Sequence, residues 1–179
     1  MKYISLAAAA LLLAAPAVHA RDISSPVETL TLATGANSVG FNNAFAAVTR
    51  GDTFADRFAF VLNGVATLDF TATSSAARVN SGLDLTGFGL YNAVTGALVL
   101  GGTKDYVNLG GKYDQYSLAY SDLAAGEYFL HVSGKMLSGS GSFAGNGVIT
   151  VSPVPEPATP FLLLGGLAVL AIGARRKTQ

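Results

Sequence analysis

The sequence has no cysteine and no tryptophan, only two histidines, and only 12% charged residues among its 179. Without cysteine, no disulfide framework can hold the fold. A zinc site normally takes several His or Cys ligands, which this chain cannot supply. There is also no G-x-S-x-G elbow and no glycine-rich phosphate loop followed by a helix. The sequence therefore lacks the motifs of zinc sites, of serine hydrolases with a G-x-S-x-G elbow and of phosphate-binding loops.

Charge is scarce and balanced over the whole chain, with 11 Lys and Arg against 11 Asp and Glu. Within residues 21–152 the count is seven basic against ten acidic residues, a net charge of 7 − 10 = −3. Nucleic-acid binding requires basic patches that can neutralise phosphates. The sequence therefore predicts no nucleic-acid partner.

The N-terminus is typical of a secretory signal peptide at residues 1–20. Lys2 precedes an apolar helix-forming run from Ile4 to Ala15, and Pro16 ends that run. Val18-His19-Ala20 then supplies a cleavage site for signal peptidase, with the cut before Arg21. The alternative is a signal anchor that stays in place, but the run is short for one.

A second apolar segment lies near the C-terminus. Residues 161–174 contain no polar side chain, and we predict a transmembrane helix over residues 158–174. Arg175, Arg176 and Lys177 follow directly and act as a basic stop-transfer sequence, since positive flanks stay cytoplasmic. This arrangement predicts a precursor anchored in the inner membrane with its domain outside. An ordinary tail anchor is the alternative.

Between these ends, residues 21–152 are divided by turn residues at intervals of roughly eight to twelve positions, which is typical of short strands. The predicted strands are Glu28–Ala33, Asp56–Leu62, Val65–Thr73, Leu83–Asn92, Ala97–Gly102, Tyr116–Tyr120, Glu127–Gly134 and Gly147–Ser152. No segment keeps a helical apolar stripe over three turns. We expect an all-β domain, an antiparallel β-sandwich of jelly-roll type, with a signal helix before it and a transmembrane helix after it.

Three connecting segments have compositions that predict their structure. Asn63-Gly64 predicts a tight hairpin between the strands on either side. The Gly- and Ser-rich stretch Leu137–Gly147 predicts a flexible loop. Residues 151–160 hold four of the six prolines and predict a stiff, accessible spacer.

Asp56 poses the main question within the domain. In a strand, Phe54, Asp56 and Phe58 share one face, so a carboxylate lies between two core residues. A buried carboxylate without a partner is costly. We predict that Asp56, near the start of its strand, accepts backbone N–H bonds from a loop or pairs with an arginine. Calcium binding and contact with a partner protein remain alternatives.

Other side chains allow less specific hypotheses. His131 is the only histidine after residue 20, and its place in a predicted strand, on the face opposite Leu130 and Val132, favours a structural role over catalysis. A structural calcium ion is possible because calcium accepts carboxylates, although no EF-hand loop is present; the candidates are Asp52, Asp56, Asp84, Asp105 and Asp114. Tyrosines could stack on sugars, though burial within strands is the simpler explanation; they are Tyr91, Tyr106, Tyr113, Tyr116, Tyr120 and Tyr128.

The C-terminal run resembles the PEP-CTERM sorting signal of Gram-negative bacteria that make exopolysaccharide. It combines the motif Val154, Pro155, Glu156 and Pro157 with an apolar helix and the basic tail, within residues 153–179. The resemblance implies recognition by exosortase, a membrane-embedded protease or transpeptidase, and removal of the tail. The protein would then reach the cell surface or the extracellular matrix.

Two further resemblances concern residues 21–152. Phe54, Asp56 and Phe58 fit the F-x-D-x-F signature of one PEP-CTERM subfamily. The domain is also similar to bacterial pre-peptidase C-terminal domains, through Asp56–Phe60, Leu83–Leu85 and Ala125–Val132. Those domains are β-sandwiches, and some bind calcium or polymers.

The sequence thus predicts a non-enzymatic exported protein without a cofactor, with a role in the exopolysaccharide or biofilm matrix. Its expected processing partners are signal peptidase and exosortase, and exopolysaccharide is a possible binding partner. The main alternative is a carbohydrate-binding module that attaches to the exopolysaccharide. An enzyme is a third and weaker alternative.

Overall fold

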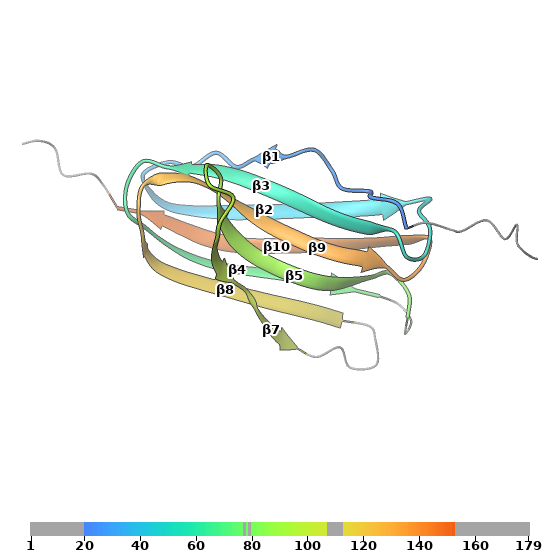
Figure 1. Cartoon of the computed structure of the whole chain (residues 1–179). Helices are drawn as coiled ribbons and strands as arrows, with labels where there is room; N and C mark the ends of the chain where they lie inside the picture. The colour runs from blue at the N-terminus through green and yellow to red at the C-terminus, as the bar shows by residue number, and fades with distance from the viewer. Residues whose placement is uncertain (1–19, 77, 79, 107–112, 153–179) are drawn as a thin grey trace, which may run out of the picture.

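The computed structural model describes residues 20–76, 78, 80–106 and 113–152, and this part of the chain is a β-sandwich (Figure 1). The all-β prediction is confirmed. None of the described segments is a helix long and apolar enough to cross a membrane. The predicted signal peptide, apart from Ala20, and the predicted transmembrane helix lie outside the described residues.

Two five-stranded sheets form the layers of the sandwich. In spatial order, sheet A consists of β1 (Glu28–Thr29), β3 (Thr53–Leu62), β9 (Gly126–Met136), β5 (Leu83–Asn92) and β6 (Leu98–Gly101). In the same way, sheet B consists of β2 (Gly35–Ala46), β10 (Ser140–Val151), β4 (Ala66–Ser75), β8 (Tyr113–Leu123) and β7 (Thr103–Tyr106). Neighbouring strands are antiparallel except β1 and β3, which are parallel.

The core forms because side chains alternate along each strand, with every second residue facing the other sheet. In β3, for example, Phe54, Asp56, Phe58, Phe60 and Leu62 are all buried. Phenylalanine rings from both sheets meet at the centre of the sandwich. They include Phe41, Phe45, Phe54, Phe58, Phe70, Phe88 and Phe143.

The predicted hairpin at Asn63-Gly64 is wrong. The strands on either side belong to different sheets, since β3 pairs with β1 and β9 while β4 pairs with β10 and β8. This dipeptide therefore carries the chain from one layer to the other. The predicted strand Glu28–Ala33 is also shorter than expected, with only Glu28–Thr29 assigned to β1.

The strand β2 is absent from the sequence-based prediction, although its signal is present. Val39, Phe41 and Phe45 recur at even spacing and are buried, separated by small or polar residues. The surrounding Gly, Asn and Ser gave this segment the composition of a loop. β2 nevertheless pairs along its full length with β10, from Gly35↔Val151 to Ala46↔Ser140.

The predicted flexible loop Leu137–Gly147 is also wrong, because most of it belongs to β10 between β2 and β4. The glycines there have a packing role. A Cβ atom on Gly145 would overlap the ring of Phe41, and one on Gly147 would overlap the Phe70 ring and the Asp69 backbone. β10 lacks side chains at these positions because large rings from both neighbouring strands fill the space.

Gly145→Ala is therefore expected to lower the free energy of unfolding by about 1–3 kcal/mol, as overpacking a core does. Chemical denaturation of the variant and the native chain measures the difference. Gly101→Ala is the matched control, since a Cβ atom there meets nothing within 4 Å. Equal stability of the Gly145 variant and the native chain would mean that this stretch does not pack as a central strand.

Candidate functional site

Asp56 is buried, with an exposed fraction of 2%, and both of its carboxylate oxygens accept hydrogen bonds. The backbone N–H of Ser25 donates to Oδ1 at 2.7 Å. The Asn43 side-chain amide donates to Oδ2 at 2.8 Å and also to the Ser25 hydroxyl at 2.6 Å. The predicted backbone donor from a neighbouring segment is thus present. The predicted alternative, an ion pair with an arginine, is not found for Asp56 among the described residues.

These bonds connect three parts of the fold. Asp56 lies in sheet A, Asn43 lies in sheet B, and Ser25 belongs to the N-terminal segment beside β3. The two phenylalanines of the signature lie on either side and pack across the sandwich. Phe54 stacks on Phe143 with ring centroids 5.4 Å apart, and the Phe58 centroid lies 4.9 Å from that of Phe41.

Asp56→Ala is expected to destabilise the fold by about 1–3 kcal/mol, because it removes the buried acceptor of the part-buried Ser25 N–H and Asn43 amide. Thermal and chemical unfolding measure this. Asp69→Ala, which removes an exposed carboxylate on sheet B, serves as the control and should change stability little. A normally stable Asp56 variant that no longer attaches to matrix would assign the residue to partner binding instead.

Four of the five aspartates considered for calcium have described side chains, and those four do not gather at one point. Within the part of the chain that the structure describes, no three Asp, Glu, His or Cys side chains form a metal-binding group. Asp52 caps a loop instead, accepting bonds from the backbone N–H groups of Thr49 and Arg21, which lower the pKa of its carboxyl. The Asp105 side chain lies outside the described atoms.

Asp84 and Asp114 do approach each other, but the cation between them is a lysine. Lys104 Nζ lies 2.8 Å from Asp114 Oδ1 and 3.9 Å from Asp84 Oδ1. Asp114 is buried, and its Oδ2 accepts the backbone N–H of Leu85 at 3.2 Å. Lys135 pairs with the other Asp84 oxygen at 3.4 Å. These contacts tie β7, β8, β5 and β9 together.

The contacts of Lys104 raise the pKa of its ammonium group above the ordinary lysine value. Burial by itself would lower the pKa of Lys104, but the hydrogen bond and the charge of Asp114 outweigh it and raise the pKa above 10.5. Burial also raises the pKa of Tyr116, whose ring lies beside Lys104. Because both folded-state pKa values are raised, their stabilisation is complete below pH 10 and is lost as the pH rises through them.

The free energy of unfolding should therefore fall as the pH rises above about 10, through the raised pKa values of Lys104 and Tyr116. Lys104→Met is expected to be less stable than the native chain at about pH 9, because it leaves Asp114 buried without its ion pair, and to lose less stability by about pH 11. Lys135→Met, which removes a half-exposed lysine, should keep the native pH dependence. If the free energy of unfolding fell equally with pH in the native chain and in Lys104→Met, the raised pKa of Lys104 would not be the cause of the pH dependence.

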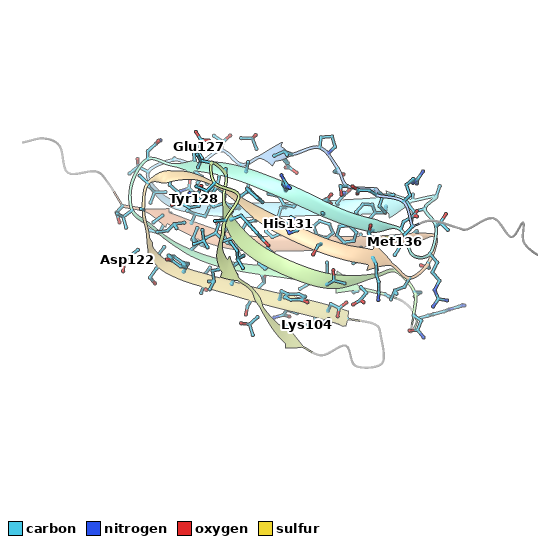
Figure 2. All side chains as sticks on the ribbon, in the orientation of Figure 1. Lys104, Asp122, Glu127, Tyr128, His131 and Met136 are labelled. Carbon is cyan, nitrogen blue, oxygen red and sulfur yellow. The ribbon has the colours of Figure 1, made fainter. Side chains whose placement is uncertain are left out.

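His131 lies in the middle of β9, on the outer face of sheet A and opposite the buried Tyr128, Leu130 and Val132, as predicted (Figure 2). Burial and then the charge of Arg57 lower its pKa. Its ring meets Tyr91 edge-on, with centroids 5.4 Å apart. No hydrogen bond in the described part of the chain joins His131 to a hydroxyl or a carboxylate.

A hollow of about 330 Å³ lies beside His131 on this outer face. We call it the Arg57 hollow, and its lining residues are Arg57, Tyr91, Ala93, Gly96, Phe129 and His131. Of the six tyrosines considered for sugar stacking, Tyr91 lines this surface hollow. Tyr116 and Tyr128 are buried in the core instead, and cannot stack on a sugar.

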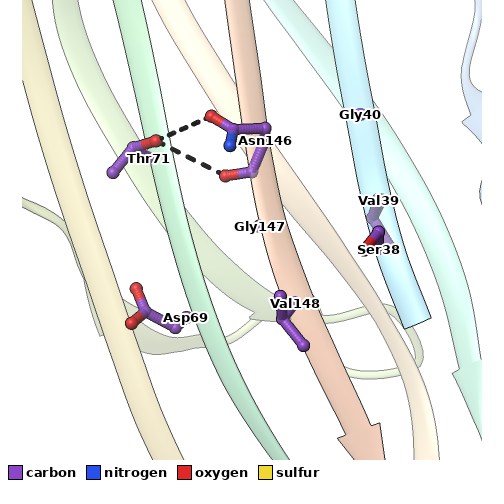
Figure 3. Close-up of a pocket in the computed structure, with 8 residues that line it drawn as sticks. All are labelled: Ser38, Val39, Gly40, Asp69, Thr71, Asn146, Gly147 and Val148. Carbon is purple, nitrogen blue, oxygen red and sulfur yellow. Dashed lines mark hydrogen bonds between the residues drawn. The ribbon is translucent and has the colours of Figure 1, made fainter. Parts of the chain in front are cut away.

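A larger and shallower hollow of about 540 Å³ lies on the outer face of sheet B, over β2, β10 and β4 (Figure 3). Gly40 leaves space in it, and the Thr71 hydroxyl donates to the Asn146 side chain at 3.0 Å. Asp69 is its one charged side chain among the described residues, and none of its lining residues is aromatic.

The described chain ends at Ser152, immediately after β10, and a second feature begins there. The family model for the PEP-CTERM protein-sorting motif matches residues 153–177. The chain carries a PEP-CTERM motif. Such a motif implies exosortase-dependent sorting of an exported, membrane-anchored precursor to the cell surface. The predicted recognition residues Val154–Pro157 and the basic residues Arg175–Lys177 fall in the matched segment, outside the described residues.

Two solved structures are similar to the β-sandwich that precedes the PEP-CTERM motif. One is the pre-peptidase C-terminal domain of collagenase from Bacillus anthracis, with 12% identity, a TM-score of 0.38, and coverage of 71% of this chain and 92% of that one. The other is PliG from Aeromonas hydrophila, a periplasmic inhibitor of g-type lysozyme, with 15% identity, a TM-score of 0.38, and coverage of 72% and 97%. The comparison with curated proteins gave no match. Likeness at this level carries no information about function.

Sequence reasoning found His131 and Tyr91 but missed Arg57 and Phe129 as their neighbours. Arg57 was missed because it occupies an unspecified position of the F-x-D-x-F signature. The signature residue Asp56 beside it points to the opposite face of the strand. Strand alternation places Arg57, Phe129 and His131 on outer faces, but it gives no information on which strands are adjacent. The pairs Arg57↔His131 and Phe129↔Tyr91 exist because β9 lies between β3 and β5.

Proposed function

We propose that this chain is a non-enzymatic structural or adhesive protein of the exopolysaccharide or biofilm matrix. The observation that carries the proposal is the PEP-CTERM motif at residues 153–177, which follows β10 after one residue. A β-sandwich exported and sorted in this way is presented outside the cell, where the matrix is assembled. Exosortase and signal peptidase are its processing partners.

The use of the buried polar side chains supports a structural role. Asp52, Asp56 and Asp114 accept bonds from the backbone or pair with a lysine, and Ser74 bonds to Asp114 and to the Leu83 carbonyl. Each of these groups holds segments of the fold together. Strongly shifted groups gathered in a cleft, which mark many active sites, are not found among the described residues.

A carbohydrate-binding module that attaches to exopolysaccharide is the second candidate, favoured by the Arg57 hollow. Aromatic side chains with a few well-placed polar groups are typical of ligand sites, and volumes of roughly 300–1,000 Å³ are usual for them. The two candidates are compatible, since a matrix protein can be held in place by its glycan.

Processing provides the direct test. Mass spectrometry of protein from the cell surface should find a C-terminus close to Pro155–Pro157, with Phe161–Ala174 absent. Glu156→Gln should keep its tail and stay in the inner-membrane fraction, whereas the control Glu28→Gln should be processed normally. Surface material that retains the intact tail from Arg175 to Gln179 would contradict sorting by tail removal.

A further inference from the structure

The Arg57 hollow is built by three adjacent strands of sheet A and one turn. Arg57 comes from β3, Phe129 and His131 come from β9, and Tyr91 comes from β5. Gly96 and Ala93, in the turn between β5 and β6, form the remaining wall with small side chains. The hollow is therefore set into the outer face of a sheet, with a turn of small residues along one side.

The aromatic groups in the hollow form a row across the strands. The Arg57 guanidinium lies 5.1 Å from the centre of the Phe129 ring. Phe129 in turn stacks on Tyr91, with centroids 5.2 Å apart and an interplanar angle of 7°. Because the two rings cover each other's facing surfaces, they present mainly ring edges to the hollow. Ring edges carry the positive end of the aromatic quadrupole.

The charge of Arg57 is available to a ligand. The ion pairs among the described residues engage Arg21, Lys104 and Lys135, and none engages Arg57. The carboxylate of Asp56, its neighbour in sequence, faces the core and is bonded to Ser25 and Asn43. Arg57 is instead positioned by its contact with Phe129, which keeps a cation with a planar donor fork at the rim of the hollow.

Two carboxylates lie near Arg57: exposed Glu28 of β1, which lines a separate hollow together with Arg57, and Glu127 on this outer face. Glu127 lies two residues before Phe129 on β9, which places it about 7 Å further along the strand. It is exposed and faces away from the core, and it is absent from the lining of the hollow. The negative charge of Glu127 repels an anionic ligand at Arg57, but among the described residues Glu127 forms no ion pair with the guanidinium.

We propose that the Arg57 hollow binds a carboxylated sugar unit within a polysaccharide chain. The guanidinium of Arg57 accommodates the carboxylate through two parallel N–H···O bonds, the arrangement that Arg favours. The Tyr91 hydroxyl and the His131 ring supply bonds to sugar hydroxyls, and Phe129 and Tyr91 supply apolar contact. An open hollow on a sheet face accepts an internal unit of a polymer, and an exported domain meets such polymers. The inference rests on the carbohydrate-binding candidate and specifies its site and ligand class.

Binding can be measured by calorimetry with the full chain solubilised in detergent. The probes are oligogalacturonate, oligomannuronate and hyaluronan, each carboxylated, together with the methyl ester of oligogalacturonate, neutral dextran and poly-glutamate. We expect binding to at least one carboxylated glycan and at least about tenfold weaker binding when its carboxylates are esterified, the loss typical of a charge-assisted hydrogen bond.

Variants connect the binding to the hollow. Arg57→Gln should weaken binding about tenfold or more, while Arg57→Lys, which keeps the charge but loses the fork, should lie between it and the native chain. Arg50→Gln, the removal of an exposed arginine outside the hollow, should bind as the native chain does. Glu127→Gln should bind more tightly. Unfolding temperatures of all four variants are measured alongside, and Arg57 lies on an exposed face where substitution should leave the fold intact.

Several results would overturn the proposal. They are no binding to any of the three carboxylated glycans, equal binding of the methyl ester, native affinity in Arg57→Gln, or equally tight binding of poly-glutamate. Binding of dextran that survives Arg57→Gln would also reject this site, yet it would leave the carbohydrate-binding candidate standing. Sorting is read separately from the C-terminal mass, so a failure of one proposal does not imply a failure of the other.

Discussion

A carboxylate buried between two phenylalanines is the constraint around which this β-sandwich is organised. A carboxylate inside the core is costly unless it accepts hydrogen bonds, and the donors to Asp56 come from Ser25 and Asn43. One belongs to the N-terminal segment beside sheet A and the other to the edge strand of sheet B. The hydrogen bonds of one side chain therefore link the N-terminal segment, sheet A and the edge strand of sheet B.

The same strand that buries Asp56 presents Arg57 to the outside. Alternation along β3, β9 and β5 divides the chain into an inner set of rings and an outer set that forms the Arg57 hollow. The core makes these strands rigid, and that rigidity positions the outer side chains for a ligand. The PEP-CTERM motif after β10 directs the sorting, so the proposed binding and the sorting depend on separate parts of the chain.

Glycine in this protein shows why composition alone can mislead. Gly145 and Gly147 gave the segment before Ile149 the appearance of a flexible linker, yet they lie in a central strand. The space of their missing side chains is filled by Phe41 and Phe70 from the strands on either side. The opposite error occurred at Asn63-Gly64, where a local hairpin signal lies at a crossing between sheets. In both cases the deciding contact comes from residues distant in the sequence.

The sequence by itself determined the all-β class, most strand positions, the inward direction of Phe54, Asp56 and Phe58, and the sorting motif. These follow from local patterns, namely side-chain alternation and a contiguous C-terminal signal. Only the tertiary structure decided which strands are neighbours, which groups bond to Asp56, that Lys104 lies between Asp84 and Asp114, and that Arg57 meets Phe129 and His131. The physical reason is that strand order results from packing the two sheets as a whole, and no short stretch of sequence encodes it.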